Sequence, residues 1–212
     1  DEEILPSEWK TVKFTREAET GLKYKLINNR TEYELIGAGY ASGDVVMESE
    51  YRGKPVTSIA KKALANNKKI TSLVIGENVK TIGDSAFSKC SALTSITIPK
   101  SVISIGEYAF QSCKALVKVT LPDSVTVIAP YTFAWCSSLA EIKLGKDLTV
   151  INEFAFSNCE KLTTISHNGV ERAEGRVQMP DTLLGVANYA FADCLSITDI
   201  TFGDSLRLGS QS

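Results

Sequence analysis

Residues 93–113 read LTSITIPKSVISIGEYAFQSC, and this stretch recurs along the chain with a fixed period. Its Ala109-Phe110 dipeptide has a counterpart 23 residues before it and another 23 residues after it. The positions equivalent to Ala109 are Ala63, Ala86, Thr132, Ala155 and, after a longer interval of 35 residues, Ala190. Such self-similarity predicts a repeat architecture in which each unit forms one coil of a solenoid.

Each repeat carries apolar side chains at two fixed places. The first set lies seven, ten and twelve residues after the alanine, as in Leu93, Ile96 and Ile98, with the alternation that a β-strand requires. The second set lies seven and four residues before the alanine, as in Val102 and Ile105. A single unit cannot bury these side chains by itself. Neighbouring units are therefore expected to stack, with their strands in a parallel sheet about 4.8 Å apart.

Phenylalanine and cysteine also keep fixed places in the repeat. The phenylalanines that follow the alanine are expected to form an internal spine: Phe87, Phe110, Phe133, Phe156 and Phe191. All five cysteines lie four residues after the alanine: Cys90, Cys113, Cys136, Cys159 and Cys194. Because this is an inward position, we expect buried, unreactive thiols. Stacked cysteines would point in parallel, so we expect no disulfides.

The pattern LxxLxLPxxVxxIGxxAFxxC in residues 93–113 resembles the BspA-type leucine-rich repeats, and the resemblance covers about residues 50–208. It implies a right-handed leucine-rich-repeat solenoid, β-dominated within the α/β type, with a parallel sheet and six 23-residue coils. Members of that family are largely surface or secreted proteins of bacteria and of some microbial eukaryotes. The resemblance therefore implies adhesion or protein recognition at an extracellular or cell-surface location.

The two ends of the solenoid depart from the repeat. Residues 22–36 alternate apolar and polar side chains on either side of Asn28-Asn29-Arg30, which predicts a β-hairpin that caps the first coil. At the other end Leu208-Gly209 resembles the next Ile-Gly, so we expect either a minimal cap or a fragment. The predicted segments are 1–21 without an assigned pattern, the N-terminal β cap at 22–52 and the solenoid at 53–212.

The fifth repeat contains 12 additional residues, because Met179-Pro180 aligns with Ile98-Pro99. The insertion falls within residues 166–177. Insertions in solenoids form loops on one side, where binding residues often lie, although a tolerated surface loop is the simpler interpretation. The candidate partner-binding residues of this segment are His167, Glu171, Arg172 and Arg176.

No catalytic or metal-binding constellation can be assembled from the sequence. His167, the single histidine, has no motif around it and is expected to be solvated or locally hydrogen-bonded. The sequence has no CxxC or Cys/His cluster with metal spacing, and no phosphate-binding GxxxxGK[ST]. We therefore expect neither an enzyme nor a bound cofactor or metal.

Composition disfavours several classes of partner. The chain has 23 Lys plus Arg against 25 Asp plus Glu, and a net charge of -2 gives no electrostatic case for nucleic acid or an anionic membrane. No apolar run approaches the roughly 18 residues that span a bilayer, so no membrane insertion is expected. Residues 1–10 lack a signal-peptide pattern, and we expect any signal peptide to have been removed.

Two surface rows are candidates for partner binding. The outward strand positions are expected to form a small, polar, concave face that includes Lys118, Glu141 and Lys143, although its Ser and Thr residues are also ordinary β-formers. A second row lies immediately before the Ala-Phe dipeptide and is aromatic. Its rings either form a binding stripe or cover the seams between coils. The aromatic candidates are Tyr108, Tyr131, Phe154, Tyr189 and the nearby Trp135.

These patterns favour a non-catalytic protein-recognition or adhesion module of a cell-surface or secreted protein, expected to be a monomer. Its expected partner is a protein of the host matrix or of another cell surface, or a glycan. The alternative, from a different functional class, is an architectural spacer that displays another domain.

Overall fold

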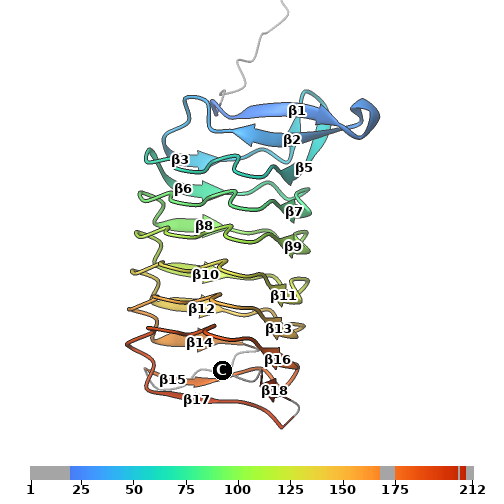
Figure 1. The fold of residues 1–212 in the computed structure, drawn as a ribbon. Helices are drawn as coiled ribbons and strands as arrows, with labels where there is room; N and C mark the ends of the chain where they lie inside the picture. The colour runs from blue at the N-terminus through green and yellow to red at the C-terminus, as the bar shows by residue number, and fades with distance from the viewer. Residues whose placement is uncertain (1–19, 168–174, 205, 209–212) are drawn as a thin grey trace, which may run out of the picture.

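The computed structural model describes residues 20–167, 175–204 and 206–208, and these form a column of stacked coils (Figure 1). Within them the only helix is a 3-10 turn, η1 (Asn28–Arg30), so the solenoid is β-dominated as predicted. The strands are β1 (Lys23–Ile27), β2 (Glu32–Gly37), β3 (Gly43–Val46), β4 (Glu50–Tyr51), β5 (Lys54–Ile59), β6 (Ile70–Val74), β7 (Thr81–Ile82), β8 (Ser95–Thr97), β9 (Ser104–Ile105), β10 (Lys118–Thr120), β11 (Val127–Ile128), β12 (Glu141–Lys143), β13 (Val150–Ile151), β14 (Thr164–Ser166), β15 (Arg176–Gln178), β16 (Gly185–Val186), β17 (Asp199–Thr201) and β18 (Arg207–Leu208).

The predicted repeat strands form a parallel sheet along one side of the column, here called the main sheet. Its order is β14-β12-β10-β8-β6-β3, and neighbouring strands are offset by one repeat, as between Val119 in β10 and Ile142 in β12. Ile142 is buried while Lys143 beside it is exposed, which confirms the alternation. β3 pairs with β6 and adds a level ahead of the six predicted coils.

The second apolar set also forms strands, which the sequence pattern did not specify. β5, β7 and β9 pair in parallel on the other side of the column, and β11, β13, β16 and β18 continue there as a separate sheet (Figure 1). The apolar core lies between the main sheet and these second-side strands. In β18, Leu208 pairs with Val186, so it takes the place of the repeat isoleucine as the sequence indicated.

The N-terminal hairpin is confirmed. β1 and β2 pair antiparallel, and β2 also pairs in parallel with β5, so the hairpin closes the end of the second-side sheet. Tyr24 stacks on Tyr51 with 4.5 Å between ring centroids, and Tyr33 meets Tyr51 edge to face at 5.0 Å. The segment boundaries at residues 21 and 52 stay a prediction.

The phenylalanine spine is the central feature of the core. Successive rings lie 5.0, 5.3, 5.5 and 5.2 Å apart between centroids from Phe87 to Phe191, with their planes within 9° of parallel. Each ring pair adds roughly 0.5–1.5 kcal/mol beyond the area that it buries. The backbone is paired at the same place, since the Phe110 N–H donates to the Thr132 carbonyl at 2.8 Å. Ring stacking and backbone pairing therefore hold adjacent coils together.

The cysteine position of the repeat serves a specific hydrogen bond. Each buried thiol donates to a backbone carbonyl of the preceding coil, as from Cys136 Sγ to the Phe110 oxygen at 3.1 Å. The same bond recurs at 3.0 to 3.2 Å in the other coils. All five cysteines are free and buried, as predicted. Burial raises the pKa of the Cys136 thiol from 9.0 to about 12.

We predict that the five thiols of the folded protein resist alkylation and react together only when the chain unfolds. The Cys136 thiol keeps its proton in the folded state up to about pH 12, whereas the unfolded thiol loses it near pH 9. The free energy of unfolding should therefore fall as the pH rises from 9 towards 12. Mass spectrometry after native alkylation checks the first point, and five rapidly labelled thiols would contradict it.

The insertion adds one strand below β14, where β15 pairs with β17 in a separate two-stranded sheet, and none to the second side. β15 lies between β14 and β17, because the Gly175 N–H donates to the Thr163 carbonyl at 3.0 Å and the Thr198 N–H donates to the Gly175 carbonyl at 2.8 Å. On the second side β13 pairs directly with β16, and the Phe156 and Phe191 rings stay 5.2 Å apart. The solenoid thus accommodates an extra strand in one sheet without opening its core.

His167 at the start of the insertion is buried, with 6% of its surface exposed. Its Nε2 lies 2.9 Å from the Gln178 carbonyl oxygen, and because a carbonyl only accepts, Nε2 is the donor. Nδ1 is buried without a hydrogen-bond partner among the described residues. The expectation of a locally hydrogen-bonded histidine is confirmed, and that of a solvated one is wrong.

The second side is interrupted between β9 and β11, which belong to separate sheets. Elsewhere the residue after each second-side strand donates to the preceding coil, as from Gly106 N–H to the Ile82 carbonyl and from Asn152 N–H to the Ile128 carbonyl. In the described structure the equivalent bond from Ala129 to Ile105 is missing. The column shows a wider interval at this level (Figure 1). We call this feature the break.

A change of residue type coincides with the break. Gly106 approaches the coil before it so closely that an added Cβ would lie 2.6 Å from the Asp84 backbone nitrogen. Ala129 holds the same position in the next coil and carries that Cβ. Ala60, Asn152 and Ala187 also carry a Cβ at this position and still donate to the preceding coil, so the Cβ alone does not account for the loss of pairing at this level.

Native-state amide hydrogen exchange tests the break. The Thr126 and Ala129 amides should exchange faster than the Thr149 and Asn152 amides one coil later, because only the latter pair donates to the preceding coil. Equal protection at the two levels would mean that the second side is continuous.

Candidate binding surface

The aromatic row before the Ala-Phe dipeptide forms a continuous ladder of stacked rings, here called the aromatic ladder. Tyr108 and Tyr131 lie 4.8 Å apart between centroids, Tyr131 and Phe154 lie 4.8 Å apart, and Phe154 and Tyr189 lie 5.0 Å apart. Their planes are within 15° of parallel. The structure therefore brings these four predicted residues together, each at its own level of the column.

The ladder residues have a backbone conformation that bulky side chains rarely adopt. The φ angles are 58° at Tyr108, 57° at Tyr131, 54° at Phe154 and 58° at Tyr189. This left-handed region favours Gly, Asn and Asp, and other residues in it cost about 1–3 kcal/mol unless their surroundings hold them there. Ring stacking offsets part of this cost. Ser85 has the same conformation two levels before Tyr131, with a φ of 55°, so the fold itself does not require an aromatic ring.

Trp135 extends the ladder sideways. Its ring lies 6.3 Å from the Tyr131 ring and is inclined to it by 11°, and 40% of the residue is exposed. It also has a positive φ, 60°, at a position where adjacent coils carry Ser112 and Asn158. Both neighbours are small and polar, so Trp135 is the one large ring in its row. It is the clearest departure from the repeat on this surface.

Exposure varies along the ladder. Tyr189 is 52% exposed, whereas Tyr108, Tyr131 and Phe154 are half-buried because the adjacent rings cover their faces. What the surface offers a partner is therefore a strip of ring edges and tyrosine hydroxyls, with the Trp135 ring beside it. Rings of this kind combine a large contact area with a polar tip, which is typical of binding hot spots.

The outward face of the main sheet is less suited to tight binding. Lys118 and Glu141 on adjacent strands form an ion pair at 2.6 Å, so each offers part of its charge to the other. Lys143 is exposed on the next outward row. Surface ion pairs contribute little, about 0–1 kcal/mol, and this face has no aromatic residue among its predicted positions.

The residues predicted from the insertion divide into three groups. Arg176 in β15 is exposed and extends the main-sheet face. His167 is buried beneath the added strand, so its ring is not available to a partner, which corrects its inclusion among the binding candidates. Glu171 and Arg172 lie outside the described residues.

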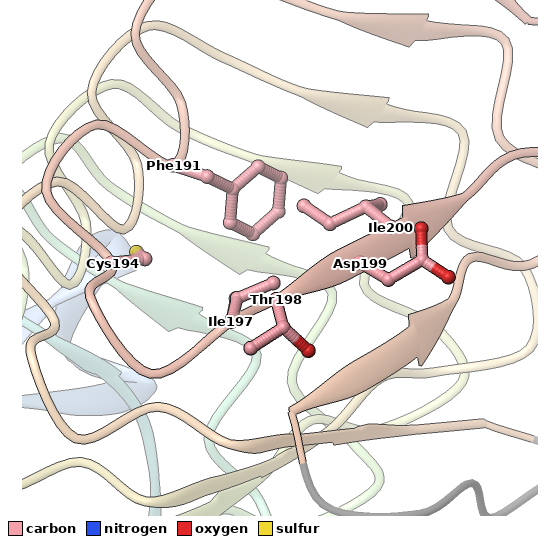
Figure 2. A pocket seen from close by; sticks show the side chains of 6 residues that line it. All are labelled: Phe191, Cys194, Ile197, Thr198, Asp199 and Ile200. Atoms are coloured by element: carbon pink, nitrogen blue, oxygen red, sulfur yellow. The ribbon is translucent and has the colours of Figure 1, made fainter.

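The last coil has a cavity of about 180 Å³, and Figure 2 shows Phe191 facing the side chains of Ile197 and Ile200 there. Asp199 is its only charged lining residue. Within the described ranges no cluster of metal-ligating side chains occurs, and no helix there is long and apolar enough to cross a membrane.

The family model for the BspA type leucine rich repeat region matches residues 57–173 and 174–211 in six copies. The chain belongs to this family. A search of curated proteins found no match. Among solved structures, the T. pallidum leucine rich repeat protein has 24% identity, covers 86% of this chain and 83% of its own, and superposes with a TM-score of 0.72. A Bacteroides capillosus leucine-rich repeat protein has 24% identity, covers 58% and 93% respectively, and has a TM-score of 0.52.

These similarities assign the fold, and the family suggests a protein-interaction or surface-type module. In this BspA-type repeat protein the residues shared with the repeat pattern are the buried ones. Trp135 lies outside that pattern, because its position is polar in the other coils. The ladder position is aromatic in four coils and polar at Lys62 and Ser85, so the fold does not require a ring there.

Sequence reasoning missed the residues around the break. Asp84, Ile103, Glu107 and Val127 are among those that line a surface cavity of about 390 Å³ there, directly beside Tyr108. The residue type at the Ala129 position gives no signal of the break, since Ala60 and Ala187 hold it in coils whose pairing is intact.

Substitutions at Trp135 and Phe133 compare the stability contribution of a surface ring with that of a core ring. We predict that Trp135→Asn changes the free energy of unfolding by less than about 1 kcal/mol, because Asn tolerates the left-handed backbone and the ring is exposed. Phe133→Ala in the same coil should cost about 3–5 kcal/mol, because it leaves a cavity in the spine. Urea denaturation measures both, and a Trp135→Asn loss comparable to that of Phe133→Ala would show that the ring is structural.

Proposed function

We propose that the protein is a non-catalytic recognition or adhesion module of a cell-surface or secreted protein, and that its partner docks on the aromatic ladder beside Trp135. The observation that carries the proposal is the placement of five large rings on a left-handed backbone where polar residues suffice elsewhere. The fold sets this backbone conformation in every coil, so the proposal depends on the aromatic identity of the side chains placed there.

The chemistry of the ladder favours a protein partner. Ring faces within the ladder are occupied by the neighbouring rings, so a sugar ring has few faces on which to stack. Ring edges and the hydroxyls of Tyr108, Tyr131 and Tyr189 suit the mixed apolar and polar surface of a protein. A glycan partner would depend on the Trp135 ring instead.

The rigidity of the column supports the same function. The spine and the coil-to-coil hydrogen bonds fix the spacing of the ladder, so little conformational entropy is lost when a partner binds. An extracellular or cell-surface location is proposed from the family, whose members are largely surface or secreted proteins. The expected partner is therefore a protein of the host matrix or of another cell surface, bound by a monomeric solenoid.

A capture experiment tests the proposal. The immobilised protein is exposed to host-matrix extract and to surface proteins of neighbouring microbes, next to a variant that carries Tyr108→Ser, Tyr131→Ser and Trp135→Asn. These substitutions use the residues found at the same positions in other coils. A retained partner should bind the variant at least about tenfold more weakly, because hot-spot residues cost more than 1 kcal/mol each.

Lys143→Thr is the matched control, since Thr120 holds that position one coil earlier and Lys143 lies on the main sheet. A partner that binds the ladder variant as tightly as the unmodified protein would refute the ladder as the site. Retention of no specific partner would favour the architectural spacer.

A further inference from the structure

The break between β9 and β11 is a gap in the backbone pairing of the second side, flanked by intact pairing. On one flank the Tyr108 N–H donates to the Pro130 carbonyl at 3.1 Å, and on the other the Ser124 hydroxyl donates to the Val102 carbonyl at 2.6 Å. The cavity of about 390 Å³ lies between these two bridges. It falls within the range of ligand-binding clefts, roughly 300–1,000 Å³.

Backbone groups of both strands are available inside the break. The Thr126 and Ala129 N–H groups donate to no described residue, and the Ile103 and Ile105 carbonyls accept from none. In the adjacent coils the equivalent groups are paired, as from Thr149 N–H to the Thr126 carbonyl. Unpaired donors on one strand and unpaired acceptors on the next are what an added strand needs in order to pair on both of its sides.

The chain itself shows that the solenoid can hold such a strand. β15 lies between β14 and β17 while the Phe156 and Phe191 rings remain 5.2 Å apart, so one side opens by a strand and the spine does not. At the break the Phe110 and Phe133 rings are 5.3 Å apart, which is the same spacing. Opening the second side at this level, as the column opens at β15, requires release of the Tyr108–Pro130 and Ser124–Val102 hydrogen bonds while the spine stays stacked.

Side chains around the break define the chemistry of the ligand. Ile103 is 58% exposed and Val127 is 41% exposed, so each offers an apolar contact on its own strand. Glu107 and Asp84 supply carboxylates at one end. Asp84 is paired with Lys61 at 3.3 Å, whereas Glu107 has no ion pair among the described residues. Ile103, Val127 and Glu107 are all exposed, so the site complements a segment that is apolar beside Ile103 and Val127 and basic at the end beside Glu107.

We propose that the break between β9 and β11 is a second binding site, in which an extended, basic segment of a protein partner pairs with both strands as an added strand. Its apolar side chains contact Ile103 and Val127, and a Lys or Arg side chain pairs with Glu107. This site does not depend on the aromatic ladder, although Glu107 and Tyr108 place the two side by side. A partner can therefore use one site or both.

The test uses as the probe a capped eight-residue peptide of valines that ends in two lysines, titrated into the whole chain by calorimetry. The expected result is saturable binding together with slower amide exchange at Thr126 and Ala129. A peptide of the same sequence with N-methyl groups at every second residue should bind at least about tenfold more weakly, because it lacks the pairing donors. A valine–glutamate peptide should not bind.

Protein variants complete the test. Val127→Ser should weaken the valine–lysine peptide, because it removes an exposed apolar contact of the break, and Ser104 holds that position one coil earlier. Val150→Ser, one coil later where the pairing is intact, is the matched control. Glu107→Gln should weaken binding and reduce its dependence on salt.

Three results would overturn the proposal: equal affinity of the N-methylated peptide, unchanged exchange at Thr126 and Ala129 at saturation, or no detectable binding. Trp135→Asn should leave peptide binding unchanged. If Trp135→Asn weakens peptide binding, the break and the ladder form one site. If the ladder variant loses its partner but still binds the peptide, the break is a separate site.

Discussion

The distance between successive coils is the constraint on which the rest of the structure depends. Backbone pairing of parallel strands requires about 4.8 Å, and the phenylalanine rings of the spine stack at 5.0 to 5.5 Å. Both interactions are met together only if every coil presents the same residues at the same places. The thiol of each cysteine adds a third tie between coils by donating to a carbonyl of the coil before it. A strict repeat is therefore a physical requirement of the core.

The same constraint explains why function is expected on the outside. Two positions in each coil adopt a left-handed backbone, one before the Ala-Phe dipeptide and one after it, and their side chains lie outside the core. The same position in the next coil lies one coil spacing away, and this spacing is also the stacking distance of aromatic rings. Aromatic residues at such a position in successive coils therefore stack as the ladder of Tyr108, Tyr131, Phe154 and Tyr189. The residue type at this position can change without altering the core.

Sequence periodicity was sufficient to predict the buried positions, because each of these side chains repeats with the coil. The spine, the five free thiols, the hairpin and the alignment of the aromatic row followed from spacing alone. Departures from the period were harder to interpret. His167 was expected in a surface loop, but the insertion returns to the column as β15, and His167 is buried and bonded to the Gln178 carbonyl of that strand. The break is a loss of backbone pairing between β9 and β11, and periodicity does not reveal it, because Ala187 repeats the residue type of Ala129 and is paired.

The central claim is that coil stacking is independent of the features added around it. Deletion of residues 167–178 tests it most directly, because this joins Ser166 to Met179 and restores the 23-residue interval between Ala155 and Ala190. The account predicts a protein that unfolds in one cooperative transition, with β14 paired directly to β17 and the Phe156–Phe191 stack retained in its structure. A deletion variant that fails to fold, or that loses the last coil, would show that the inserted strand is part of the stack, and would contradict the account.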